Sequence, residues 1–363
     1  MKKNRLAVAV AALLLWHCLL FAGPPLGHVI GWGDNTAGQA TGVPTENPPN
    51  ISNSSTGLVL ITGLPLTNAV AISAGRSHSL ALRKDGTVAA WGGNFGGAAV
   101  GSETPSPHRA NGPVRLGGAQ LSNVVAISAG GNFSLALQGD GTVVAWGWGM
   151  GEAHGRGLEV PPGLTNVVQI AAGWNYNLAL TRDGTVIEWG DRKPPAGLSN
   201  IVAISTGGGF YAPSLALKGD GTVIEWRGAN GDQDPTPAGL SNLVAVAAGA
   251  GHCLALRRDG VVVGWGDNNW GQATGVPNPV LPHRSEGTVV LAGQPLSGVV
   301  AIAAGCDYSL AVRRDGTVVA WGGGFSHVTN VPTGLSNVVA VAAGENFCLT
   351  LTTNGARWVH ENR

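Results

Sequence analysis

The stretch Asn68-Ala-Val-Ala-Ile-Ser-Ala-Gly75, followed by Ser79-Leu-Ala-Leu82 and by Asp85-Gly-Thr-Val-Ala-Ala-Trp91-Gly92, decides the fold of this 363-residue chain. The same unit returns, with small changes, to the end of the chain. The glycine that ends its first segment occurs seven times, at Gly75, Gly130, Gly173, Gly207, Gly249, Gly305 and Gly344. Length alone would suggest two or more domains, but a short recurring unit predicts one repeat architecture.

Each unit contains a tight turn between two apolar segments. An Asp-Gly pair stands there in six units and Asn354-Gly355 in the seventh, which predicts a hairpin turn of the primed type, with positive φ at both residues. Six periodic acids could also suggest metal ligands, but the turn accounts for all of them. These turn residues are Asp85, Asp140, Asp183, Asp220, Asp259 and Asp315.

The first and last segments of each unit differ in side-chain size. The first is rich in Ala, Ser and Gly, whereas the last is rich in Val and ends in Trp. Small side chains suit strands that crowd around a central axis, and large ones suit strands farther out. Apolar and polar residues do not alternate cleanly, as expected when both faces of each sheet are buried. We therefore predict an all-β propeller.

The tryptophans predict how the ring closes. Six units end in Trp, but the unit that starts at Asn337 has none at that spacing. Near the other terminus, His28-Val-Ile-Gly-Trp32-Gly33 is a Trp segment without a preceding hairpin partner. We predict that this N-terminal strand pairs with the C-terminal half-blade and completes a seven-bladed propeller over residues 27–355. Trp358, two residues short of the repeat spacing, is an alternative for the same role.

The spacing between units varies, so insertions must lie in loops or in an outer strand. Two long insertions, residues 108–116 and 283–291, resemble each other. They predict duplicated segments at the outer edge of two sheets rather than separate domains.

Composition argues against a partner recruited by charge. Lys and Arg number 21, as do Asp and Glu, so the formal net charge is zero. Such a chain has no basic field to hold nucleic-acid phosphates or an anionic membrane surface. We predict no nucleic-acid partner, and a monomer.

The start of the chain predicts export. Basic residues up to Arg5 precede 17 uncharged residues from Leu6 to Ala22, the pattern typical of a secretory signal peptide. We predict a signal peptide over residues 1–22, a secreted or periplasmic protein without a membrane attachment after cleavage, and a C-terminal tail over residues 356–363. An uncleaved membrane anchor is the alternative, although this stretch barely spans a bilayer.

The run Val300-Ala-Ile-Ala-Ala-Gly305, Ser309-Leu-Ala-Val312 and Asp315-Gly-Thr-Val-Val-Ala-Trp321-Gly322, with Trp265-Gly-Asp-Asn-Asn-Trp-Gly-Gln272, resembles the regulator of chromosome condensation repeat. The resemblance extends over nearly the whole chain and implies a seven-bladed propeller. The short units look closer to bacterial members, including secreted propellers that inhibit β-lactamases. The nuclear founder of the family exchanges guanine nucleotide on a small GTPase and binds chromatin. A signal peptide and a neutral charge argue against both roles here.

The sequence shows no convergent set of catalytic groups. His78 and His252 occupy one repeat position, and a position that also accepts Phe and Tyr predicts packing rather than a ligand or a base. His108 and His283 lie in the insertions without a third metal ligand. No glycine-rich stretch opens a helix, as a phosphate loop requires. We predict no enzymatic activity, no cofactor and no metal. The aromatic residues at the histidine position are Phe133, Tyr176, Tyr308 and Phe347.

Functional residues are expected where the repeat varies. The residues directly after each inner glycine differ between units, and loops at one position in every unit gather on one face of a propeller. Loop aromatics are typical anchors of recognition sites, although filling gaps between loops is an equal alternative. The candidate binding residues are Arg76, Asn132, Trp174, Asn175, Phe210, Tyr211, Asp307, Glu345, Trp148, Trp270 and Phe325.

The sequence thus predicts an exported, non-enzymatic module that recognises a protein or a surface glycan through variable loops on one propeller face. An extracytoplasmic hydrolase or lyase is the alternative, and it requires paired carboxylates or metal ligands at the mouth of the axis. Guanine-nucleotide exchange is a third possibility that requires an N-terminus that is not a signal.

Overall fold

The computed structural model describes residues 27–45, 54–148, 159–190, 192–209, 211–228, 231–234, 236–280, 283–323 and 327–353. The predicted signal peptide over residues 1–22 and the predicted tail over residues 356–363 lie outside these ranges, as do Asn354 and Trp358. Within these ranges, no helix is long and apolar enough to cross a membrane.

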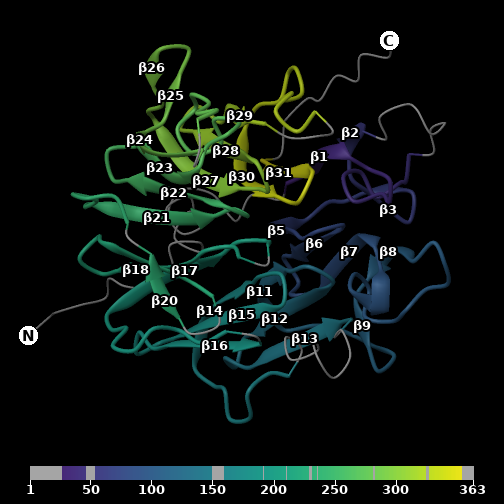
Figure 1. The fold of residues 1–363 in the computed structure, drawn as a ribbon. Coiled ribbons are helices and arrows are strands. Elements are labelled where there is room, and N and C mark those ends of the chain that lie inside the picture. Colours follow the sequence, from purple (N-terminus) through teal and green to yellow (C-terminus); the bar gives the residue numbers. More distant parts are fainter. Residues whose placement is uncertain are drawn as a thin grey trace, which may run out of the picture.

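Each repeat unit folds into an antiparallel sheet, and the described residues form seven sheets of three or four strands (Figure 1). The small-residue segments form the first strands: β5 (Ala69–Ala74), β11 (Val124–Ala129), β14 (Val167–Ala172), β17 (Ile201–Thr206), β21 (Leu243–Ala248), β27 (Val299–Ala304) and β30 (Val338–Ala343). The second strands are β6 (His78–Arg83), β12 (Phe133–Gln138), β15 (Tyr176–Thr181), β18 (Ser214–Lys218), β22 (His252–Arg257), β28 (Tyr308–Arg313) and β31 (Phe347–Thr352). The prediction of an all-β chain is confirmed.

The tryptophan segments form the third strands, which are β7 (Val88–Gly93), β13 (Val143–Gly147), β16 (Val186–Gly190), β19 (Val223–Arg227), β23 (Val262–Asp267), β29 (Val318–Gly322) and β1 (Val29–Asp34). Four sheets have a fourth strand: β2 (Ser54–Leu58), β8 (Arg109–Pro113), β20 (Asp232–Asp234) or β24 (Arg284–Thr288). The two similar insertions supply β8 and β24, as predicted for duplicated outer segments.

A two-stranded hairpin follows three of these fourth strands. The hairpins are β3 (Leu60–Ile61) with β4 (Leu64–Pro65), β9 (Arg115–Leu116) with β10 (Ala119–Gln120), and β25 (Val290–Leu291) with β26 (Gln294–Pro295). The described residues contain a single short 3-10 segment, η1 (Phe95–Gly97).

The two ends of the chain share one sheet, in the strand order β2-β1-β31-β30 (Figure 1). Trp32 of β1 lies opposite Cys348 of β31, and the two strands are antiparallel. This is the pairing that the lone N-terminal Trp segment predicts. The sheet that contains both ends of the chain contacts the sheet of β5, β6, β7 and β8, because β30 and β31 both contact β5.

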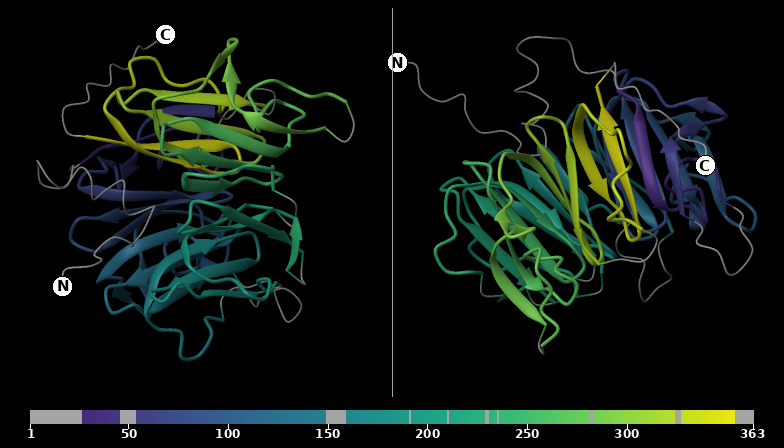
Figure 2. Two further views of the ribbon diagram at one scale, coloured as in Figure 1. Left: turned by 90° about the vertical axis from the view of Figure 1, so that its left-hand side faces the viewer. Right: turned by 90° about the horizontal axis from the view of Figure 1, so that it is seen from above.

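The first strands of successive sheets contact one another in chain order, and the last of them, β30, contacts β5 again. Figure 2 shows the sheets stacked face to face along this order. The hydrophobic core therefore lies between neighbouring sheets. Leu80 and Leu82 of β6, for example, pack with Trp146 of the next sheet, and each buried leucine contributes about 2 kcal/mol of apolar burial.

The hairpin turns differ from the predicted primed type. In the first unit Gly86 has φ +77°, but Asp85 is not among the residues with positive φ. The Gly86 amide donates to the Arg83 carbonyl and the Arg83 amide to the Thr87 carbonyl, which is a three-residue loop with glycine in the left-handed position. The Asp85 carboxylate accepts from both the amide and the hydroxyl of Thr87. These bonds lower the pKa of Asp85 and favour the turn observed.

Candidate functional site

Two sets of loops lie on one face of the molecule: the loops that join first to second strands, and the loops that follow third strands. Backbone hydrogen bonds connect them, from Gly93 N–H to Ser77 O at 2.7 Å and from Trp148 N–H to Asn132 O at 2.9 Å. Antiparallel pairing places the two sets of loops together, because the first and third strands of a sheet run in the same direction and end on the same side of the molecule. We call this surface the loop face.

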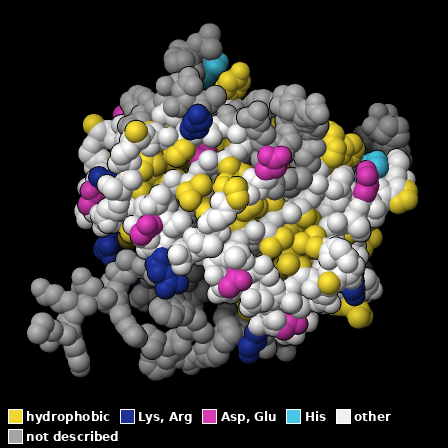
Figure 3. Space-filling model, turned by 90° about the horizontal axis from the view of Figure 1, so that it is seen from below, with side chains coloured by type: hydrophobic (Ala, Val, Ile, Leu, Met, Phe, Trp, Pro, Cys, Tyr) yellow, Lys and Arg dark blue, Asp and Glu magenta, His cyan; other side chains and the backbone are white. Residues whose placement is uncertain are grey.

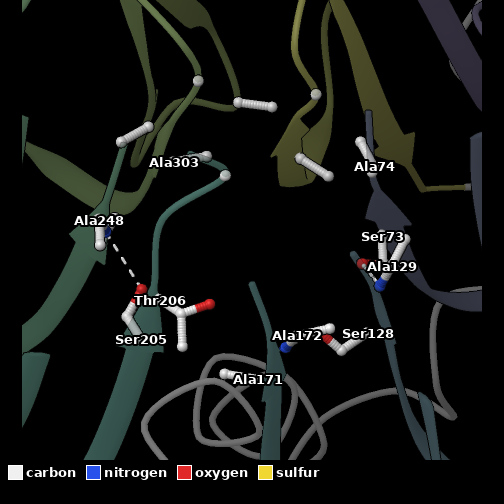
Figure 4. A pocket seen from close by; sticks show the side chains of 18 of the residues that line it. Ser73, Ala74, Ser128, Ala129, Ala171, Ala172, Ser205, Thr206, Ala248 and Ala303 are labelled. Carbon is white, nitrogen blue, oxygen red and sulfur yellow. Dashed lines mark hydrogen bonds between the residues drawn. The ribbon is translucent and has the colours of Figure 1, made fainter. Parts of the chain in front are cut away.

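A cavity of about 430 Å³ runs between the first strands of all seven sheets. Its wall consists mainly of Ala, Ser, Gly and Val, in agreement with the small residues expected near the axis (Figure 4). Serine hydroxyls connect neighbouring sheets there: Ser73 accepts from the Ala129 amide at 2.9 Å, and Ser205 from the Ala248 amide at 3.1 Å. These hydroxyls therefore have partners within the wall.

The recurring inner glycine is required by a close approach between sheets. A Cβ built on Gly75 would lie 2.5 Å from the carbonyl oxygen of Gly130 and 2.9 Å from the His78 ring. A Cβ at Gly130 or at Gly249 would lie similarly close to a carbonyl oxygen of the next sheet and to the ring at the histidine position. Any side chain here would push two sheets apart at the mouth of the cavity.

The histidine position is a packing position, as predicted. His78 and His252 are fully buried, and each Nε2 lies 2.9 Å from a serine hydroxyl of the next sheet, that of Ser134 or Ser309. Burial lowers the pKa of His78 to about 4 and that of His252 to about 3. Within the described ranges, no group of three His, Cys, Asp or Glu side chains could hold a metal ion.

At the rim of the cavity, three candidate residues from three different sheets meet. Arg76 Nε donates to Glu345 Oε2 at 3.2 Å, and the Arg76 guanidinium lies 4.6 Å from the centre of the Trp174 ring. The ion pair is partly exposed, so it contributes less than about 1 kcal/mol. Its effect is to hold a cation and an indole in fixed positions at the mouth of the cavity.

In the loop that follows β27, burial and the nearby charge of Asp267 raise the pKa of Asp307, which is hydrogen-bonded to Cys306. Burial and the charges of Asp307 and Glu345 raise the pKa of the Cys306 thiol to about 12, so this thiol is not a nucleophile near neutral pH. Figure 3 shows one face of the molecule, on which acidic and basic side chains are interspersed. No field of one sign covers that face.

The remaining candidates that the structure describes do not line the cavity. Tyr211 is 79% exposed and Trp270 is 54% exposed. Trp148 forms an edge-on contact with Phe95, at 4.9 Å between ring centres. The structure therefore does not collect all the predicted aromatics in one pocket. Asn132 and Asn175 are partly buried in the loops between first and second strands, while Phe210 and Phe325 lie outside the described residues.

Two nearly identical loops on this face were not recognised from the sequence. Residues 34–44 read DNTAGQATGVP and residues 267–277 read DNNWGQATGVP. In each loop a buried asparagine, Asn35 or Asn268, accepts from two backbone amides and donates to a loop carbonyl. Their self-similarity within the chain is the signal that could have found them. Trp270 stands where the first loop has Ala37, so the loop fold does not need the indole.

The tryptophan N–H groups are satisfied by the preceding sheet. Trp91 and Trp321 donate to the carbonyls of Gln39 and Gln272, which lie in the two similar loops. The third and fourth sheets have shorter connections and use a buried carboxylate instead. Trp226 donates to Glu188 at 2.9 Å, and Trp265 donates to Glu225. The Ile-Glu-Trp sequence of these two units is the signal for this exchange.

Arginines accompany the two buried acids in different ways. Arg227 forms an ion pair with Glu225 at 2.8 Å. Arg192 donates to the Ala212 carbonyl at 2.6 Å and lies over the Tyr176 ring at 3.7 Å. Burial raises the pKa of Glu188 to about 7, despite the Trp226 hydrogen bond and the attraction of Arg192.

Comparison with known proteins agrees with this architecture. The family model of the regulator of chromosome condensation (RCC1) repeat matches residues 69–97, 124–151, 167–191 and 243–272. A human protein described as probable E3 ubiquitin-protein ligase HERC6 is 33% identical over 120 residues, which are 33% of this chain and 11% of that protein. The chain thus spans only a small part of this relative.

Solved structures show the same fold. Prp20p from Saccharomyces cerevisiae, studied for its binding to Gsp1p and histones, superposes with a TM-score of 0.70 at 19% identity, over 99% of this chain and 97% of that one. Human WBSCR16 gives a TM-score of 0.66 at 18% identity, over 90% and 100% of the two chains. Four segments of the chain therefore match the model of the regulator of chromosome condensation repeat, and the chain has the all-β fold of these solved structures.

Proposed function

We propose that this chain is an exported, non-enzymatic, seven-bladed propeller that binds a partner protein through its loop face. Each of the seven sheets is then one blade, and the pairing of β1 with β31 closes the ring. The matched family model and the propeller fold support a role in protein interaction. The secreted bacterial branch, with its inhibitors of β-lactamases, remains the part of the family that the short units resemble.

The observation that carries the proposal is Trp270. Its indole is 54% exposed, yet the twin loop folds with Ala37 at the same place. A large apolar side chain that the fold does not require, held at an exposed position, is typical of an anchor residue in a protein interface. The amide of Trp270 donates to Gln272 Oε1 at 2.9 Å, which fixes the backbone that presents the indole.

Trp270→Ala tests the proposal, because it gives this loop the alanine that the first loop has at residue 37, and we expect it to leave the loop fold intact. The full chain and the variant are immobilised side by side, and the affinities of captured secreted proteins are measured for both. We expect the variant to lose at least about tenfold in affinity, as for a central anchor. Leu64→Ala, at an exposed position of the β3-β4 hairpin, is the matched control and should bind as the native chain does.

Equal binding by the native chain and Trp270→Ala would contradict the site. A glycan array probed with the same pair separates the two partner classes, since sugar binding lost with Trp270 would replace the protein partner by a glycan. Export is tested separately, by locating a tagged full-length chain in cell fractions and by sequencing the mature N-terminus. A cytoplasmic chain with its first 22 residues intact would contradict export but not the binding face.

A further inference from the structure

A second interaction surface lies at the outer edge of the sixth sheet, away from the loop face. In the described residues three sheets end at their third strand, namely those of β13, β16 and β29. Among these, β29 is the clearest open edge. Residues 149–158, which follow β13, lie outside the described ranges, as do the three residues 324–326 after β29, and β16 has three buried residues where β29 has one.

Comparison with the four-stranded sheets shows what β29 lacks. In β7 and in β1, the first five of the six residues are all buried, because a fourth strand covers them. In β29 only Trp321 is buried, and the four others are partly exposed. The same repeat position is thus closed in one sheet and accessible in another.

The four-stranded sheets show which backbone groups of β29 point outward. In the first sheet Val88 O accepts from Val114 N–H at 2.9 Å, and in the fifth Val262 O accepts from Val289 N–H at 2.9 Å. Val318 holds the same position in β29, and its carbonyl has no such donor among the described residues. Antiparallel pairing then turns the backbone groups of Ala320 and Gly322 to the same open side.

Nothing in the strand protects this edge. Val318-Val-Ala-Trp-Gly322 contains no proline and no charge, and its pairing with β28 shows no bulge. Natural proteins use those features to keep open edges from recruiting other strands. An apolar, regular and unprotected edge is suited to adding a strand.

The chain itself shows which strand fits, because the same interface occurs three times within it. In each case a tripeptide of the fourth strand has the same register against the third strand. Its small residue lies opposite the Gly that follows the Trp, its polar residue lies opposite the Trp, and its glycine lies opposite the residue before the Trp. These tripeptides are Ser55-Thr56-Gly57, Ala110-Asn111-Gly112 and Ser285-Glu286-Gly287. A Cβ at Gly112 would meet no atom within 4 Å, whereas Gly287 has φ +141°, a backbone conformation that favours glycine. The register is therefore the feature that the three strands share.

We propose that the edge of β29 binds an extended segment of a partner polypeptide as a fourth antiparallel strand, with a small-polar-glycine tripeptide opposite Gly322, Trp321 and Ala320. The backbone of the segment supplies the hydrogen bonds, and the register selects the tripeptide. This surface belongs to the sixth sheet, although the Trp270 side chain of the fifth sheet contacts Gly323, the residue that follows β29.

The probe is a fluorescent peptide with the sequence of residues 283–290, His-Arg-Ser-Glu-Gly-Thr-Val-Val. Its binding to the full chain is followed by anisotropy, and its site by hydrogen exchange. At a free concentration ten times the Kd, exchange of the outward amides of residues 318–322 should slow about tenfold. Residues 262–267, whose outer side β24 already occupies, should be unchanged.

Two controls remove the proposed bonds from opposite sides. A peptide with proline in place of its glycine lacks the amide that faces the edge, and it should not bind. The variant Ala320→Pro removes an outward amide while it keeps the bonds to β28, and it should weaken binding at least about tenfold. Tyr211→Ala, which removes another exposed loop aromatic in the fourth sheet, should bind the peptide as the native chain does, which separates this proposal from the loop-face function.

The proposal is overturned if bound peptide leaves the exchange of residues 318–322 unchanged. Equal affinity of the proline peptide would overturn it as well, as would undiminished binding by a folded Ala320→Pro variant. The proline peptide keeps the test decisive even where Ala320→Pro lowers the stability of the protein.

Discussion

The two buried carboxylates of the third and fourth sheets allow a prediction with an internal control. Glu188 and Glu225 have the same structural role, since each accepts a hydrogen bond from the indole N–H of a tryptophan in the next sheet. Replacement by glutamine keeps an acceptor oxygen and removes the charge. We expect the two variants to behave differently, because burial raises the pKa of Glu188 to about 7, whereas Glu225 forms an ion pair with Arg227 at 2.8 Å.

The pKa of Glu188 determines how much its contribution to the free energy of unfolding changes with pH. Burial raises this pKa from 4.5 to about 7. A raised carboxyl pKa means that the folded state prefers the proton, so its contribution to stability is fully present below pH 4.5 and is lost as pH rises to about 7. Between pH 5 and pH 8 the native chain should lose about 2 to 3 kcal/mol from this group, at 1.36 kcal/mol for each pKa unit. Glu188→Gln does not undergo this loss.

Urea unfolding of the native chain and Glu188→Gln, followed by tryptophan fluorescence from pH 5 to pH 8, measures the difference. The stability of the variant relative to the native chain should rise by about 2 to 3 kcal/mol over that interval. Glu225→Gln leaves the Arg227 charge without its carboxylate. It should destabilise the protein by about 3 kcal/mol.

The reasoning is refuted if the relative stability of Glu188→Gln is independent of pH, or if it falls as pH rises. Either result would mean that Arg192, and not burial, dominates the free energy of the Glu188 carboxylate.

Three further predictions concern the repeat scaffold and its loops. His252 has its pKa lowered to about 3 by burial, so its contribution to stability is present above pH 6.5 and is lost on acidification; His252→Phe, the residue type at Phe133, should flatten the fall in melting temperature from pH 6.5 to pH 4. Gly130→Ala places a Cβ 2.7 Å from the Gly173 carbonyl oxygen, and calorimetry should show a loss of about 1 to 3 kcal/mol; an unchanged transition would contradict the close approach. Asn268→Ala removes four hydrogen bonds of the loop over residues 267–277, so proteolysis should cut this loop first and faster than in the native chain.

Much of the fold was predictable because its signals are local and repeated. The inner glycine, the Asp-Gly turn and the terminal Trp occupy fixed places in each unit, and the sheets observed use them at those places. The lone Trp32 segment also predicted its antiparallel pairing with β31. The turn type was wrong, because the carboxylate of Asp85 bonds Thr87 and stabilises a loop that a residue pair alone does not specify.

The candidate site was only partly predictable. Sequence variation marked Arg76, Trp174 and Glu345, but not that they meet at the rim of one cavity. It also marked Trp148 and Trp270, which the structure places apart from that rim. The acceptor roles of Glu188 and Glu225 were missed, because each carboxylate serves a tryptophan in the following unit.

The sequence by itself determined the unit: which segments are strands, where the chain turns, and which residues are small enough to lie near the axis. Only the tertiary structure decided how units meet, that both loop sets share one face, and that β29 has no fourth strand beside it among the described residues. The physical reason is the range of the interactions. A turn or a strand depends on neighbours within one unit, whereas the contact of Arg76 with Glu345 joins residues that are 269 positions apart, and no pattern inside a single repeat records it.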